Sequence, residues 1–331
     1  MIKVAVCGIG SMGLNHLRVY SEMQDVQVIA VADEDKNRLD LAEMKYPIAA
    51  YTDYKELMEK EKPQAVSIVV PTSLHETFAI AAIESGAHVF IEKPIADSIE
   101  SGERIIARAK QHNKKIMVGH IIRYNPAIQL LKQKLDAGML GRIFQIFCRR
   151  TGPFPARIRD VGVVIDLAPH DVDIMCYLTG SKPLRVYAET MQKIHTQHED
   201  LLLAILRFPN DITASLEINW LTPTKVREIN VLGERGLFKV DDLTQDLYFY
   251  ENSQANHELW SPLKQIKGVS EGIMTRFAVQ RQEPLKLELQ AFVNAIKQDV
   301  VMPISGEDGL LALRIALSLV ASAQTNMVVE V

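Results

Sequence analysis

Gly8-Ile9-Gly10-Ser11-Met12-Gly13 is the stretch of sequence that decides the fold. It follows an apolar run at residues 4–7, typical of a buried strand, and opens residues 14–23, which can form a helix. In such a turn the first glycine permits the tight bend, the second lets the backbone approach a pyrophosphate, and the third allows close helix–strand packing. The N-terminus of the following helix offers free N–H groups to the diphosphate. The stretch therefore predicts a strand, turn and helix that bind a dinucleotide.

Asp33, which follows the second apolar run, indicates which dinucleotide this turn would take. It stands 20 residues beyond Gly13, where an acidic residue hydrogen-bonds the adenosine ribose hydroxyls. Its carboxylate would repel a 2′-phosphate, so the sequence favours NAD over NADP. Lys36 and Arg38 are close enough along the chain to leave NADP as an alternative. A glycine turn that binds nothing is the remaining alternative.

The first 120 residues alternate between short apolar runs and helix-like stretches. The expected strands are residues 4–7, 26–32, 65–70, 89–91 and 116–118, and the expected helices are residues 36–44, 74–84 and 99–111. Strands that are apolar on both faces and alternate with helices predict a doubly wound parallel sheet. We therefore expect an α/β protein with a Rossmann domain at residues 1–120, and 331 residues leave room for a second domain.

The pattern changes after residue 119, and residues 121–331 are expected to form an α/β domain for substrate binding and oligomerisation. Consecutive strands joined by turn residues predict a mostly antiparallel open sheet. The expected strands are residues 143–150, 185–191, 201–208, 212–219, 226–232, 236–240 and 246–250, and the expected helices are residues 127–135, 166–178, 285–298 and 307–323. The polar, weakly periodic stretch 252–282 is expected to be a mobile loop.

The composition excludes several classes of protein. Hydrophobic residues make up 47% of the chain and charged residues 24%. The net charge is −4, and the sequence has no basic stripe. Neither a nucleic-acid nor a membrane partner is therefore expected. No apolar run approaches the roughly 18–20 residues that span a bilayer. The N-terminus reads as a strand and not as a signal peptide. The three cysteines, Cys7, Cys148 and Cys176, lack metal-ligand spacing, which is typical of reduced thiols in a cytoplasmic protein.

Two later strand ends carry candidate catalytic and cofactor-binding residues. In an open parallel sheet, ligands bind outside the carboxyl ends of the strands. Pro71, Thr72, His75, Glu92 and Lys93 follow two of the expected strands, so they should border the cofactor crevice. Lys93 is the candidate catalytic residue among them. The alternative for Glu92-Lys93-Pro94 is a solvated loop.

Asp166 and His170 form the second candidate cluster. They are four residues apart, so on a helix they share one face. Pro169 is tolerated only in the first turn of a helix, so the helix should start no earlier than about Ile165. His170 would then lie near the helix N-terminus, whose dipole favours the neutral imidazole that a general base requires. In the alternatives, Asp166 and Asp171 only cap the helix, or Asp166, His170 and Asp173 bind a metal; without further ligands, no metal is expected.

These residues together give the chain a resemblance to the glucose–fructose oxidoreductase / inositol dehydrogenase (Gfo/Idh/MocA) family along essentially its whole length. The matching pieces are Gly8–Gly13, Asp33, Glu92-Lys93-Pro94, Arg123-Tyr124-Asn125-Pro126 and the segment with Asp166 and His170. The resemblance implies a Rossmann domain followed by an α/β domain whose open sheet supports homodimers or homotetramers. It also implies that Lys93, Asp166 and His170 form the catalytic group, in which we assign His170 as the general base. Arg123, Tyr124 and Asn125 would help to place a sugar.

One segment departs from the family pattern and another points to a branch of the family. The family often has consecutive glycines where Asp160 and Val161 precede Gly162, and another glycine where this chain has Ala168. Residues 149–162 look most like the branch that oxidises C3 of UDP-linked amino sugars, and their arginines could pair with a diphosphate. The arginines assigned to substrate are Arg157 and Arg159. A basic loop without this role, a dehydrogenase of free sugars or inositol, an NAD-dependent glycoside hydrolase and a non-catalytic NAD-binding regulator remain alternatives.

Overall fold

The computed structural model describes all of the chain except residues 156–160, 195–196 and 255–268. The described residues form two compact units, one of Met1–Tyr124 with Glu283–Arg314 and one of Asn125–Gln282 with Ile315–Val331. The first break lies close to the expected boundary at residue 120. Glu283–Arg314, however, join the first unit and not the second. The reason is packing between distant segments: helix α8 (Pro284–Lys297) buries Leu289 and Phe292 and contacts helix α1 (Ser11–Ser21).

The first unit contains the expected parallel sheet. Its order is β3-β2-β1-β4-β5-β6, and every pair of neighbours is parallel. The strands are β1 (Ile2–Cys7), β2 (Val26–Ala32), β3 (Ala49–Tyr51), β4 (Ala65–Ile68), β5 (His88–Glu92) and β6 (Ile116–Gly119). The strand order reverses between β1 and β4, and this switch point is where a doubly wound sheet binds its ligand. The prediction of a Rossmann fold is confirmed.

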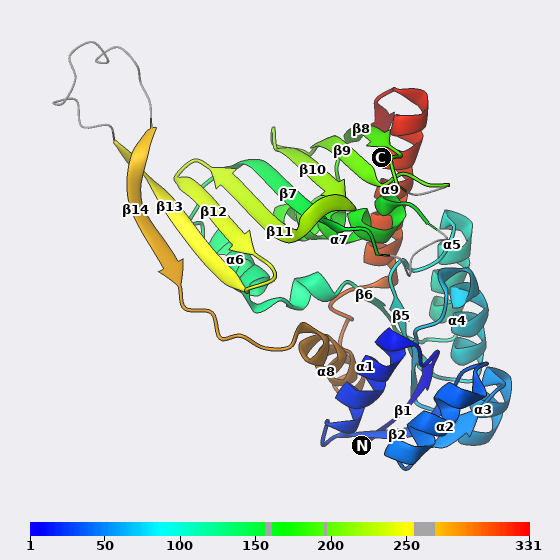
Figure 1. Ribbon diagram of the computed structural model, residues 1–331. Coiled ribbons are helices and arrows are strands. Elements are labelled where there is room, and N and C mark those ends of the chain that lie inside the picture. Colours follow the sequence, from blue (N-terminus) through cyan, green and yellow to red (C-terminus); the bar gives the residue numbers. More distant parts are fainter. Residues whose placement is uncertain (156–160, 195–196, 255–268) are drawn as a thin grey trace, which may run out of the picture. The chain divides into compact units, whose positions relative to one another are not determined.

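Helices connect these strands and cover the sheet. They include α2 (Lys36–Lys45), α3 (Tyr54–Glu61), α4 (His75–Glu84) and α5 (Ile99–Gln111). Figure 1 shows α4 beside α5, which it contacts. The apolar pattern of the sequence did not predict β3 and α3. A strand of three residues has no apolar run long enough to detect, and β3 is defined by its pairing with β2.

The second unit is built on a nine-stranded sheet. Its order is β14-β13-β12-β11-β7-β10-β9-β8-β15, and all neighbours are antiparallel except β7 and β10. The strands are β7 (Ile143–Pro153), β8 (Arg185–Met191), β9 (Leu201–Arg207), β10 (Thr213–Asn219), β11 (Leu221–Gly233), β12 (Gly236–Asp241), β13 (Asp246–Gln254), β14 (Val269–Phe277) and β15 (Val329–Glu330). The mostly antiparallel sheet is confirmed. The expected loop at 252–282 is wrong in part, because β14 lies inside it and pairs with β13.

One face of this sheet is covered and the other is open. Ile146, Ala214 and Leu206 pair across three strands and are all buried, so they define the covered face. Helix α7 (Val163–Thr179) contacts β7, β9 and β10, and helix α6 (Pro126–Asp136) contacts β12 and β13. The alternate residues of β9, Leu203 and Ile205, remain 48% and 55% exposed.

The remaining features are a shared helix and free thiols. Helix α9 (Gly306–Thr325) contributes residues to both units. Within the described ranges, the helices are too short or too polar to cross a membrane. Cys7, Cys148 and Cys176 are all described, and none of them forms a disulfide bond.

Candidate dinucleotide and substrate sites

The glycine turn has the geometry that a dinucleotide requires. Gly8 has a φ of +84°, and a Cβ there would lie 2.4 Å from the Val69 carbonyl oxygen. A Cβ on Gly13 would lie 1.9 Å from the carbonyl oxygen of Gly8, so α1 can start this close to β1 only with glycine at that position. Both positions therefore require glycine for local reasons of backbone conformation and space.

Gly10, by contrast, faces open space. A Cβ on Gly10 would meet no heavy atom within 4 Å. Gly10 is the N-cap of α1, no side chain caps the helix, and its first turn has no acidic residue. Backbone N–H groups and the positive end of the helix dipole are thus left for a ligand, which is the arrangement that binds a diphosphate. The residues present fit a dinucleotide.

Asp33 at the end of β2 is joined to this turn. Its Oδ2 accepts a hydrogen bond from the Ile9 N–H at 2.8 Å, and its Oδ1 accepts one from the Asp35 N–H at 3.0 Å. The Asp33 side chain is only 5% exposed, and Arg38 Nη1 lies 3.5 Å from both carboxylate oxygens. The carboxylate that would meet the adenosine ribose is therefore held in place and has a guanidinium beside it.

His75 lies between the two strand-end turns, and both of its ring nitrogens face backbone carbonyl oxygens. Its Nδ1 is 2.9 Å from the Pro94 carbonyl oxygen and its Nε2 is 3.0 Å from the Val70 carbonyl oxygen. Burial lowers the pKa of His75 below its usual value. The ring thus joins the turn after β4 to the turn that carries Lys93, and its predicted place at the border of the cofactor crevice stays a prediction. Pro71 is exposed and Thr72 half-buried at the same edge.

Glu92 is also engaged within the unit. His16 of α1 is fully buried, and its Nε2 lies 3.0 Å from Glu92 Oε1. Burial alone would raise the pKa of Glu92, but the hydrogen bond from His16 and the Lys93 charge outweigh it and lower that pKa below its ordinary value. The backbone N–H of Lys93 donates to Glu92 Oε2 at 3.3 Å. Lys93 itself is half-buried at the end of β5. The sequence analysis missed His16, because no local pattern links it to β5.

The residues at 123–125 have structural partners. Arg123 Nη2 lies 3.3 Å from Asp308 Oδ1 in the first unit, and Tyr124 is buried. In the second unit, Asn125 caps α6, because its Oδ1 accepts from the Ala127 N–H at 2.9 Å. The Asn125 amide also donates to the Asp242 carbonyl oxygen at 2.9 Å.

Asp166 and His170 lie on one helix, α7, and are one turn apart, as expected. The expected start of this helix is wrong. It begins at Val163, and Pro169 lies inside it. Pro169 and its neighbour Ala168 are buried, so tertiary packing keeps a helix that local preference would have shortened. His170 is therefore the eighth helical residue, beyond the first turn in which the dipole acts strongly. The expected position of His170 in the first turn of the helix, where the dipole would favour a neutral ring, is therefore wrong.

Glu199 supplies the cap of α7. Its Oε1 accepts a hydrogen bond from the Val164 N–H at 3.1 Å, and its carbonyl oxygen accepts from the Val163 N–H at 2.9 Å. A Cβ on Gly162 would lie 2.0 Å from Glu199 Oε1. Gly162 is thus needed to admit a carboxylate that the sequence analysis did not connect with the helix.

Asp171 does not cap the helix, so that alternative is wrong for this residue. It forms a bidentate ion pair with Arg150 of β7, at 2.8 Å to Nε and 2.9 Å to Nη2. Both side chains are buried. Arg149 on the opposite face pairs with Glu217 at 2.7 Å. Two of the four arginines expected near a diphosphate are thus paired within the protein.

The remaining predicted site residues are divided between the two units or lie outside the described residues. Arg157 and Arg159 lie outside the described residues. Lys93 belongs to the first unit, and Asp166 and His170 belong to the second. In the part of the chain that the structure describes, no group of three or more His, Cys, Asp or Glu side chains is arranged to hold a metal ion. The metal-site alternative gains no support there.

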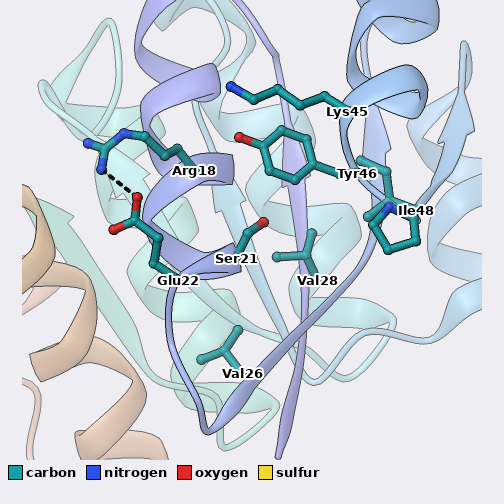
Figure 2. A pocket seen from close by; sticks show the side chains of 9 residues that line it. Arg18, Ser21, Glu22, Val26, Val28, Lys45, Tyr46 and Ile48 are labelled. Carbon is teal, nitrogen blue, oxygen red and sulfur yellow. Dashed lines mark hydrogen bonds and ion pairs between the residues drawn. The ribbon is translucent and has the colours of Figure 1, made fainter.

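Figure 2 shows a cavity in the first unit that is not part of this site. It has a volume of about 590 Å³. Its lining comes from the end of α1, the start of β2 and the segment after α2, namely Arg18, Ser21, Glu22, Val26, Val28, Lys45, Tyr46, Pro47 and Ile48. Val26 is the first residue of β2, whereas Asp33 follows its last. The cavity therefore lies at the amino end of β2, and the dinucleotide turn at the carboxyl end of the sheet.

A glycine turn at the switch point of a doubly wound sheet, with an acidic residue after β2, defines a dinucleotide-binding protein of the Rossmann class. Residues 2–120 match the family described as "Oxidoreductase family, NAD-binding Rossmann fold", and residues 128–239 match the "GFO/IDH/MocA C-terminal domain". The chain belongs to the Gfo/Idh/MocA family of oxidoreductases.

Relatives and solved structures of this family match nearly the whole chain. UDP-N-acetylglucosamine 3-dehydrogenase of Acidithiobacillus ferrooxidans is 28% identical over 316 residues, covering 96% of this chain and 95% of the relative. Its solved structure has a TM-score of 0.85 and covers 98% of both chains at 27% identity. The scyllo-inositol 2-dehydrogenase (NAD(+)) of Bacillus subtilis is 26% identical, covering 99% of this chain and 96% of the relative.

Proposed function

We propose that this protein is an NAD-dependent dehydrogenase that oxidises a secondary hydroxyl of a sugar, namely C3 of a UDP-linked amino sugar. The observation that carries this proposal is the similarity to the UDP-N-acetylglucosamine 3-dehydrogenase of A. ferrooxidans, which extends over both units in sequence and in structure. The dinucleotide turn, Lys93, Asp166 and His170 are all present.

The proposed reaction removes a proton from a ring hydroxyl and a hydride from the carbon that bears it. NAD, when bound, supplies the acceptor for the hydride. His170 acts as the general base that takes the hydroxyl proton. Lys93 donates a hydrogen bond to the reacting oxygen and stabilises the negative charge that develops there. Asp166 lies one turn before His170 on α7 and orients the His170 side chain. The protein forms no covalent bond with the sugar.

The preference for NAD rests on Asp33. Its buried carboxylate would repel a 2′-phosphate, whereas Arg38 beside it would attract one. We expect the carboxylate to dominate, because the Arg38 side chain is 50% exposed and its charge is screened by solvent. Asp33→Ser should therefore weaken NAD binding and strengthen NADP binding, and fluorescence titration of both dinucleotides measures this. Equal affinities of the unaltered protein for NAD and NADP would contradict the proposal.

A dehydrogenase of inositol or a free sugar is the second candidate, favoured by the similarity to the B. subtilis scyllo-inositol 2-dehydrogenase. The test is incubation of the purified protein with NAD and a panel of UDP-sugars, free sugars and inositols, read by the absorbance of NADH. The proposal predicts NADH with UDP-N-acetylglucosamine or a close relative of it. NADH with inositol or glucose alone would establish the second candidate. Product release without net NADH would indicate a glycoside hydrolase. The absence of turnover with every substrate would indicate a non-catalytic regulator.

We also propose a homodimer or homotetramer that assembles through the open face of the second unit's sheet. The exposed Leu203 and Ile205 on that face support it. A cytoplasmic location is proposed as well, and the three free cysteines support it.

A further inference from the structure

Arg227 lies in the second unit, where β11 meets β7. The pairing of these strands is irregular between Leu221 and Val226 and becomes regular again at Val226 and Arg227. Arg227 pairs in register with Arg150, whose buried side chain marks the covered face of the sheet. Directly opposed residues of a sheet lie on the same face, so Arg227 faces the side that α7 covers. Thr151, which pairs with Val226, lies near the end of β7, and α7 is the next helix along the chain.

Among the residues that the structure describes, the guanidinium of Arg227 is anchored through Nη1 alone. Its Nη1 donates to the Thr151 carbonyl oxygen at 2.6 Å and to the Val226 carbonyl oxygen at 2.7 Å. A guanidinium has five N–H groups, so this leaves the edge formed by Nε and Nη2, which can bind an oxyanion with two parallel hydrogen bonds. Among the described residues, no carboxylate lies within 4.0 Å of Arg227. Arg150, by contrast, has the carboxylates of Asp171 and Asp242 within that distance.

The charge of Arg227 is consequently not balanced by a contact of its own. Burial and the nearby Arg150 charge lower the pKa of Arg227 to about 10, although Asp171, Asp242 and Asp166 act in the other direction. Leaving a half-buried cation without a paired anion is unfavourable for folding. Arg150, which pairs with Arg227 across the two strands, forms its ion pair with Asp171 of α7, so this cation lies on the side of the sheet near the candidate catalytic helix.

We infer that Arg227 is a further residue of the substrate site and binds an anionic group of the substrate near α7, the helix that carries Asp166 and His170. This inference rests on the proposed function, to which it adds the residue that would select a negatively charged sugar. A diphosphate and a sugar carboxylate both fit the Nε–Nη2 edge, because each presents two oxygens to a planar guanidinium. Neutral inositols offer no such group, so Arg227 would discriminate against them.

The test measures binding and does not depend on turnover. The full-length protein, saturated with NAD, is titrated by calorimetry with UDP, with glucuronate and with myo-inositol. Arg227→Gln should weaken the binding of an anionic probe about 10- to 100-fold, as expected for the loss of hydrogen bonds to a charged group. Arg227→Lys, which keeps the charge but loses the planar edge, should lie between. Arg149→Gln is the matched control. Arg149 precedes Arg150 on β7, lies on the opposite face of the sheet and forms an ion pair with Glu217.

The probes distinguish the two sources of charge. Weaker binding of UDP in Arg227→Gln identifies a diphosphate, and weaker binding of glucuronate alone identifies a carboxylate. The inference is overturned if the unaltered protein binds neither anion, or if Arg227→Gln and Arg227→Lys, shown to be folded by thermal unfolding, bind both as well as the unaltered protein does. Its failure is distinguishable from that of the proposed function. If UDP binds through Arg227 but UDP-N-acetylglucosamine yields no NADH, the reaction is wrong and the inference stands.

Discussion

At the residue scale, the turn that carries Lys93 is held by two buried histidines. His75 joins it to the turn after β4, and His16 joins Glu92 to α1. Neither histidine is placed to touch a sugar, so both support the turn from inside the first unit. Both contacts therefore hold the turn that carries Lys93, the candidate catalytic lysine.

Lys93→Ala tests that role. Turnover should fall by about 10²- to 10⁴-fold, because the reacting oxygen loses the group that stabilises its charge. The dinucleotide turn is untouched, so the dissociation constant for NAD, measured by fluorescence, should stay within about 3-fold, well under the tenfold that 1.4 kcal/mol produces. Lys110→Ala, an exposed lysine paired with Glu307, is the control. Near-normal turnover in Lys93→Ala would rule out the assignment.

The pair of His16 and Glu92 makes stability depend on pH. The pKa of Glu92 is lowered in the folded protein, so its ionised form stabilises the fold. That contribution is present above the ordinary pKa of a glutamate and is lost as pH falls through the lower folded value. Glu92→Gln should therefore be less stable than the unaltered protein at pH 7, and the gap should narrow toward acid pH.

Urea unfolding at a series of pH values measures this gap. Glu43→Gln, an exposed carboxylate of α2, serves as the control and should show no comparable dependence. A gap between Glu92→Gln and the unaltered protein that stays constant with pH would contradict the role given to Glu92.

At the scale of elements, α7 is the helix whose placement matters most for the candidate chemistry. It carries Asp166 and His170, contains a proline, and has a cap from Glu199, a residue of another segment. The Arg150–Asp171 pair holds the helix to β7. The helix is thus determined by contacts from outside it to a greater extent than by its own sequence.

Glu199→Ala should cost about 0.5–2 kcal/mol of stability, the usual range for losing a capping side chain. Chemical unfolding measures the loss. Asp53→Ala removes the cap of α3, where Asp53 accepts from the Lys55 N–H at 2.9 Å, and should cost a similar amount. Only Glu199→Ala should also lower kcat, since only α7 carries candidate catalytic residues. If the two variants affect turnover equally, Glu199 has no special role in placing α7.

At the scale of the whole molecule, the open sheet face of the second unit is the feature that bears on assembly. Ile205 is 55% exposed in the middle of β9. If copies of the chain meet there, Ile205→Glu would bury a charge in the interface and should shift the protein toward the monomer mass of 37.2 kDa. Light scattering coupled to size-exclusion chromatography measures it. Leu41→Glu, an exposed apolar residue of α2, should leave the mass unchanged. A monomeric unaltered protein would contradict the proposed assembly.

The sequence by itself determined the elements whose signal is local. The apolar runs predicted β2 and α5 with their observed bounds, and the glycine spacing with Asp33 predicted the dinucleotide turn. Such signals are readable because periodicity and turn chemistry act between residues that are near one another in the chain.

Only the tertiary structure decided the rest. It assigned Glu283–Arg314 to the first unit, paired β3 and β14 with their neighbours, and brought Glu199 to the start of α7. It also separated Arg149 and Arg150, which the sequence grouped with the substrate arginines, from Arg227, which the sequence did not single out. Burial, strand pairing and ion pairs between distant segments have no local pattern, because they depend on which parts of the chain meet in space.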